Sequence, residues 1–163
     1  MAWKFSVLVV ANVTAASDEL LAALKRRAER GQCAFMLLVP ATGGGREGRE
    51  AAQARLAAAV ERIRGEGLEV EGVIGDADPV IAVHDVWDPR RFDEIVISTL
   101  PTGASRWLAV DLPHRVEKFT GVQVEHVVAA EPRPPAHTEP APEPDHYGVL
   151  SPLAAITGKR TAT

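Results

Sequence analysis

The sequence contains a single cysteine, Cys33, among its 163 residues. One thiol excludes an internal disulfide and any metal site built from several cysteines. Because Cys33 lies beside an apolar run, we expect it to be a buried, unreactive thiol. The five histidines lack the spacings that zinc sites use, and no G-x-S-x-G motif is present. The sequence therefore predicts neither a metal centre nor a catalytic residue.

A basic excess and a long hydrophobic run are also missing. The formal net charge is −4, so we expect no nucleic-acid partner. No apolar run approaches the ~18 residues that a membrane-spanning helix needs. The apolar N-terminal stretch has some features of a signal peptide, but Asn12 interrupts it early, and a strand over residues 4–11 accounts for it better. We therefore expect a cytoplasmic protein that does not contact membranes.

Five short apolar runs are present instead, and they predict five strands, at residues 5–11, 34–41, 68–75, 94–99 and 122–130. Three of the runs are continuously apolar, which is typical of parallel strands covered on both faces. The third and fifth runs alternate in part, which favours positions near the edges of the sheet.

Helical patterns fill the gaps between these strands, over about 18–30, 47–64, 79–87, 104–110 and 113–120. Ser17 and Asp78 are expected to cap the first and third helices. Pro113 disfavours a helical conformation at Leu112, so the last helix is expected to begin at Pro113, with the Asp111 carboxylate satisfying its N-terminus. This alternation predicts an α/β fold, a doubly wound five-stranded parallel sheet between two helical layers. Ligands in such sheets bind at the carboxyl ends of the strands, which selects the loops 12–17, 40–48 and 98–112.

The composition changes after Glu131, where prolines become frequent. We expect an α/β domain over residues 1–130, a proline-rich linker over 131–146 and a C-terminal tail over 147–163. Within the tail, the apolar residues of 147–156 predict a docking segment that covers an apolar patch of its own domain, a dimer mate or another protein.

Two loops have the composition of phosphate-binding loops. GGGREG at 43–48 matches G-x-G-x-x-G, but charged residues surround its glycines and it follows the second strand, so a solvated loop is the better interpretation. The loop after the fourth strand contains Thr102, Gly103 and Ser105 at a helix start. These residues can offer N–H and hydroxyl groups to an anion, or Thr102 or Ser105 can cap the helix itself. The sequence leaves both alternatives open.

The arrangement resembles the universal stress protein family over residues 5–130. The similarity is carried by VLVVAN at the first strand, by GVIGDADPVIAVHD, and by FDEIVIST running into the loop at 98–112. The resemblance implies a five-stranded parallel sheet and a homodimer formed through the last strand, residues 122–130. It also implies ATP binding through G-x2-G-x9-G-[S/T] after the fourth strand, with an aspartate at the end of the first.

This sequence departs from that motif at each position. The glycines fall at Ser98, Pro101 and Asp111, the hydroxyl residue at Leu112, and the aspartate at Asn12. Val39, at the place where the second strand would face an adenine, remains compatible with the family pattern. We therefore expect weak or no ATP binding and no bound cofactor.

Three functions remain open, in decreasing order of support. The first is a non-catalytic, dimeric regulatory or interaction domain. The second is a binding protein for a nucleotide or another small anion, and its candidate residues are Asn12, Val39, Ser98, Thr99, Thr102, Gly103 and Ser105. An enzyme that hydrolyses nucleotides has the least support, because no base or metal-ligand set is visible.

Overall fold

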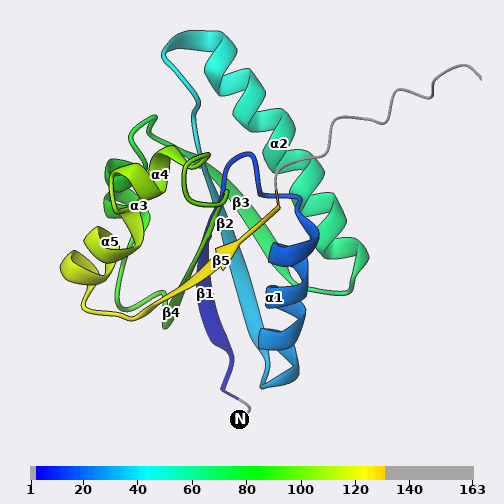
Figure 1. Cartoon of the computed structure of the whole chain (residues 1–163). Coiled ribbons are helices and arrows are strands. Elements are labelled where there is room, and N and C mark those ends of the chain that lie inside the picture. Colours follow the sequence, from blue (N-terminus) through cyan, green and yellow to red (C-terminus); the bar gives the residue numbers. More distant parts are fainter. Residues whose placement is uncertain (1–2, 131–163) are drawn as a thin grey trace, which may run out of the picture. The chain divides into compact units, whose positions relative to one another are not determined.

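Five parallel strands form one sheet in the order β3-β2-β1-β4-β5 in the computed structural model, which describes residues 3–130 (Figure 1). The strands are β1 Phe5–Val10, β2 Cys33–Pro40, β3 Val70–Gly75, β4 Glu94–Thr99 and β5 Val124–Val128. The predicted five-stranded α/β sheet is confirmed, and β3 and β5, the strands with alternating patterns, are its edges. The predicted linker at 131–146 and tail at 147–163 lie outside the described residues.

Helices cover both faces of this sheet, as Figure 1 shows. They are α1 Asp18–Glu29, α2 Gly45–Gly65, α3 Pro79–Val86, α4 Arg106–Ala109 and α5 Leu112–Thr120. α1 and α2 pack on the face that contains Val9, and α3 and α5 pack on the face that contains Val10. Successive side chains of a strand point to opposite faces, so a strand covered on both sides must be apolar at every position. This is why β1 reads as a continuous apolar run.

Local capping signals are confirmed at two helix starts. The Ser17 hydroxyl accepts a hydrogen bond from Leu20 N at 3.2 Å, and the Asp78 carboxylate accepts one from Val80 N at 2.8 Å. Each bond satisfies an N–H group that has no partner within the helix.

The glycine-rich segment departs from the prediction. α2 begins at Gly45, two residues before the predicted start at 47, so the segment up to Gly48 is partly helical rather than a loop throughout. A Cβ at Gly48 would collide with the backbone carbonyl of Thr42. Glycine at this position therefore allows the first turn of α2 to pack directly against the backbone of the β2–α2 loop.

The start of α5 also differs from the prediction. The helix begins at Leu112, one residue before Pro113, and Leu112 has no exposed surface. Burial of a leucine side chain contributes about 2 kcal/mol, which outweighs the steric bias against helix before proline. Asp111 adopts the left-handed conformation, with φ 52° and ψ 46°, and its side chain makes no capping hydrogen bond. The predicted capping role of the Asp111 carboxylate is therefore wrong.

The strand order reverses direction at β1, whose neighbours are β2 on one side and β4 on the other. The connections from these strands leave in opposite directions, which opens a crevice at the carboxyl ends of β1 and β4. Within residues 3–130 no helix combines the length and the apolar character needed to cross a membrane.

Candidate functional site

A cavity of about 330 Å³ lies at the carboxyl ends of β1 and β4. It receives residues from all three loops that the sequence analysis selected. Its lining consists of Asn12, Val13, Thr14, Thr42, Ser98, Thr99, Leu100, Ala104, Ser105, Arg106 and Trp107. The cavity therefore sits where doubly wound sheets bind their ligands.

The cavity brings together Asn12, Ser98, Thr99 and Ser105, four of the seven residues selected from the sequence. Thr102 and Gly103 lie in an exposed turn, where Gly103 adopts φ +96°, and they do not line the cavity.

Val39 has a different environment from the one that the sequence analysis assigned to it. It belongs to the core on the α1–α2 face and has no exposed surface, so it does not face the cavity.

The hydroxyl groups on the β4 side are engaged in bonds within the protein. Thr99 Oγ1 donates to Leu100 O at 2.9 Å and lies 2.7 Å from His126 Nε2. Ser105 Oγ accepts a hydrogen bond from Leu108 N at 3.3 Å. Of the two alternatives for Ser105, the structure shows the helix cap.

Two backbone donors of the same loop are engaged as well. The Pro101 carbonyl accepts hydrogen bonds from Ala104 N at 3.1 Å and from Ser105 N at 3.2 Å. A phosphate-binding loop leaves such N–H groups free to point at the ligand. This loop uses two of its N–H groups to close its own turn.

Ser98 is the exception among these hydroxyl groups. Its side chain is buried and Ser98 Oγ has no hydrogen-bond partner among residues 3–130, although its backbone carbonyl accepts a bond from Thr14 Oγ1 at 3.2 Å. A buried hydroxyl without a partner carries a free-energy cost of about 1–3 kcal/mol.

A hydrogen-bond network that the sequence analysis missed involves two of the lining residues, Asn12 and Thr42. Arg55 of α2 donates from Nη1 to Asn12 Oδ1 at 3.0 Å and to Thr42 Oγ1 at 2.8 Å. Asn12 Nδ2 in turn donates to Thr42 Oγ1 at 3.1 Å. In the sequence, Arg55 can be recognised only as a basic residue beside the buried positions of α2. Its hydrogen-bond partners lie in two other loops.

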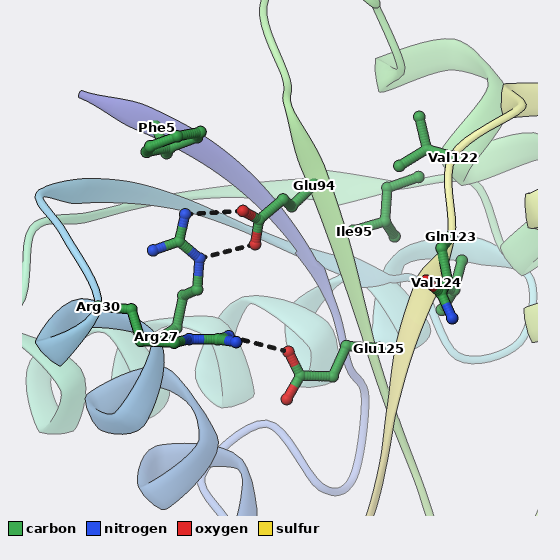
Figure 2. A pocket seen from close by; sticks show the side chains of 9 residues that line it. All are labelled: Phe5, Arg27, Arg30, Glu94, Ile95, Val122, Gln123, Val124 and Glu125. Carbon is green, nitrogen blue, oxygen red and sulfur yellow. Dashed lines mark hydrogen bonds and ion pairs between the residues drawn. The ribbon is translucent and has the colours of Figure 1, made fainter. Parts of the chain in front are cut away.

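A second cavity, of about 620 Å³, lies at the amino ends of β1, β4 and β5, and Figure 2 shows its lining. Arg27 of α1 forms two hydrogen bonds of 2.7 Å with the Glu94 carboxylate and lies over the Phe5 ring, 4.8 Å from its centroid. Arg30 reaches toward Glu125 at 4.0 Å (Figure 2). The charges of this cavity are thus paired within the protein, which makes it a weaker candidate for a charged ligand.

Comparison with known proteins identifies the fold. No protein-family model matches the chain, and no curated protein matches its sequence. Among solved structures, a universal stress protein from Archaeoglobus fulgidus is similar with a TM-score of 0.57 and 22% identity, over 76% of this chain and 93% of that one. The universal stress protein from the same organism in complex with dAMP has a TM-score of 0.57 and 23% identity, over 78% and 99%.

A universal stress protein in complex with cAMP is also similar, with a TM-score of 0.52 and 18% identity, over 76% of this chain and 96% of that one. The protein therefore has the fold of the universal stress proteins. The resemblance inferred from the sequence is confirmed at this level.

Proposed function

We propose that the protein is a non-catalytic regulatory or interaction domain with the universal stress protein fold, which acts in the cytoplasm without the family's ATP binding. The observation that carries this proposal is the loop after β4. Its Ala104 and Ser105 N–H groups bond to the Pro101 carbonyl, and its Ser105 hydroxyl caps α4. These two N–H groups are therefore not available to a triphosphate.

The composition of the cavity supports a non-catalytic role. Among its described lining residues, Arg106 is the only one with an ionisable side chain, and a guanidinium does not exchange protons near neutral pH. General acid–base catalysis needs a carboxylate, imidazole or similar group within hydrogen-bonding reach of the reacting atoms. The described lining offers binding groups rather than such a catalyst.

Nucleotide content and affinity test the proposal. Mass spectrometry of material released from purified, denatured protein should detect no ATP, and calorimetric titration should give weak or no ATP binding. The titration includes dAMP and cAMP, because structural neighbours were solved with these nucleotides. Co-purified ATP or tight ATP binding by the unmodified protein would overturn the proposal.

A double variant tests the physical reason. Pro101→Gly with Asp111→Gly restores two of the family's three glycines and frees the loop backbone, so it should raise ATP affinity measurably. Leu112→Ser is left out because Leu112 is fully buried and its truncation would empty part of the core. Pro89→Gly, the same change in the loop before β4, is the matched control and should change nothing. A folded double variant without any gain would contradict the role assigned to the loop.

The proposed domain forms a homodimer through β5. The position of β5 at an edge of the sheet supports this proposal, because an unpaired edge strand offers free backbone groups to a second chain. In the sequence, the alternating residues Val122, Val124 and Val127 suggest an apolar edge. Val124 and Val127 belong instead to the protomer's own core, and Val128 is the valine of β5 that is 48% exposed. A protein partner for residues 147–156, which lie outside the described residues, stays a prediction.

Binding of a small ligand is the second candidate function. The cavity at the carboxyl ends of β1 and β4 favours it, because it is large enough for a small molecule and its described lining is mainly apolar and hydroxyl-bearing. A regulatory domain of this kind would respond to a ligand other than ATP.

A further inference from the structure

Helices α3 and α5 lie side by side on one face of the sheet and carry exposed apolar side chains on their outer surface (Figure 1). Ile81 of α3 is 47% exposed and Phe119 of α5 is 38% exposed. The His84 ring contacts the Phe119 ring, with 5.8 Å between the centroids. Ile81 and His84 are three positions apart on α3, so they lie on the same side of that helix. We call Ile81, His84 and Phe119 the α3–α5 patch. Exposed apolar groups that gather in this way are typical of interaction surfaces.

The exposed charges beside this patch have opposite signs on the two helices. Asp85 of α3 lies four positions after Ile81, and therefore on the same side of its helix. On α5, Arg115 lies four positions before Phe119, and Lys118 directly precedes Phe119. The patch thus has an acidic border on α3 and a basic border on α5.

The two borders do not neutralise each other within one protomer. Among residues 3–130, Arg115 and Lys118 form no ion pair, and the contact of Asp85 is with its neighbour His84, at 4.0 Å. Glu117, the acidic residue of α5, is half-buried, and its carboxylate accepts a hydrogen bond of 2.9 Å from the backbone of β5. The acidic border and the basic border are therefore both available to a second molecule.

A second copy of the chain has the charges that this surface requires. α3 and α5 each lead from one parallel strand to the next on the same face of the sheet, so they run in roughly the same direction. A two-fold axis along the line between the two helices brings two copies face to face and places α3 of each copy on α5 of the other. Asp85 of each copy then faces Arg115 and Lys118 of the other. The symmetry creates this match twice, around an apolar centre.

We propose that the α3–α5 patch is a self-association surface, on which a second copy of the chain packs about a two-fold axis with α3 of each copy on α5 of the other. The two helices have eight and nine residues, so the interface is small. Small interfaces are weak and transient, and we expect a dissociation constant of about 0.1–1 mM. The patch is separate from the edge of β5, so it would join β5 dimers into larger assemblies at high local concentration. The inference goes beyond the proposed function and does not depend on the loss of ATP binding.

Two charge variants of the full chain test the proposal, alone and mixed. Asp85→Lys makes both borders basic, and Arg115→Glu with Lys118→Glu makes both borders acidic. Each variant alone brings like charges together at both contacts, so its self-association should weaken at least about tenfold. An equimolar mixture of the two variants pairs opposite charges at both contacts, and it should restore association to within about threefold of the original. Recovery on mixing is specific to an interface between α3 and α5 of different copies.

Sedimentation velocity measures the association, from about 10 µM to about 1 mM, a range that brackets the expected dissociation constant. All chains carry Val128→Lys, which removes the proposed pairing through β5. The mass of the chain with and without Val128→Lys at about 10 µM tests that pairing separately, because the weaker α3–α5 contact is not populated there. Glu61→Lys reverses an exposed charge on α2, which covers the other face of the sheet, and is the matched control that should change nothing.

The salt dependence of the chain with its original patch gives a test that needs no charge variant to fold. Exposed charges are screened by salt, so association should weaken as the ionic strength rises from about 0.05 M to about 0.3 M. A chain that stays monomeric up to about 1 mM would overturn the proposal and leave the patch to a different protein. Association that is insensitive to salt, that survives both charge variants, or that does not recover when they are mixed would overturn it as well.

Discussion

The ion pair between Arg27 and Glu94 joins α1 to β4, and the two partners differ in their access to water. Arg27 is 5% exposed, whereas the Glu94 side chain is 35% exposed. Removing one partner leaves the other charge uncompensated, and the cost depends on whether water can reach that charge. The two single substitutions should therefore destabilise the protein unequally.

Glu94→Gln should be the more damaging change. It leaves a buried guanidinium facing a neutral amide, and the loss of one partner of a fully buried pair costs about 3–5 kcal/mol. Water reaches the Glu94 side of this pair, so we expect a smaller decrease in the free energy of unfolding, of about 2–3 kcal/mol. Arg27→Met loses the two charge-assisted bonds and the contact with the Phe5 ring, but Glu94 can turn to solvent, and we expect a decrease of about 1–2 kcal/mol.

Urea unfolding of the two single variants and of the double variant measures these costs. The double variant should be at least as stable as Glu94→Gln alone, because it removes the buried charge that the single change leaves behind. Glu66→Gln is the control, because it breaks an exposed ion pair with Lys25, which lies on α1 as Arg27 does. This change should leave the unfolding free energy unchanged. A larger loss for Arg27→Met than for Glu94→Gln, or strict additivity in the double variant, would refute this reasoning.

Other predictions concern single positions. Burial lowers the pKa of His126 below 6.5. The unfolded chain therefore takes up this proton at a higher pH than the folded protein, and the unfolding free energy should fall as the pH drops below about 6.5. Urea unfolding at about pH 7.5 and pH 5.5 should show a weaker pH dependence for His126→Gln than for the unmodified protein. Asp111→Gly removes the backbone strain of a non-glycine residue in the left-handed conformation. It should raise the unfolding free energy by about 0.5–1 kcal/mol in urea titrations, whereas a decrease would contradict the left-handed conformation of Asp111. Burial raises the pKa of the half-buried Cys33 thiol, so a disulfide reagent should modify it more slowly in the native protein than in urea. Val128→Lys should convert the proposed dimer to a monomer in light scattering, and an unchanged mass would argue against an interface at β5.

The sequence by itself determined the layers of this protein. Continuous apolar runs, partly alternating runs and short capping signals predicted the five strands, the two edge strands and the caps at Ser17 and Asp78. These signals are local, because a strand covered on both faces must be apolar throughout and a cap bonds to residues two or three positions away. The position of the cavity followed from the same information, because parallel strands bring their carboxyl ends to one edge.

Which side chains meet at and beside the cavity was decided by the tertiary structure. Asn12, Thr42 and Arg55 come from three different segments, and their contact requires the packing of α2 on the sheet. Whether a residue near a strand end faces the cavity or the core depends on a shift of a single position, because neighbouring side chains point to opposite faces. Val39 lies in the core for this reason, and the burial of Leu112 moved the start of α5. The pairing of Arg27 with Glu94 likewise required the register between α1 and β4, which no local pattern in the sequence specifies.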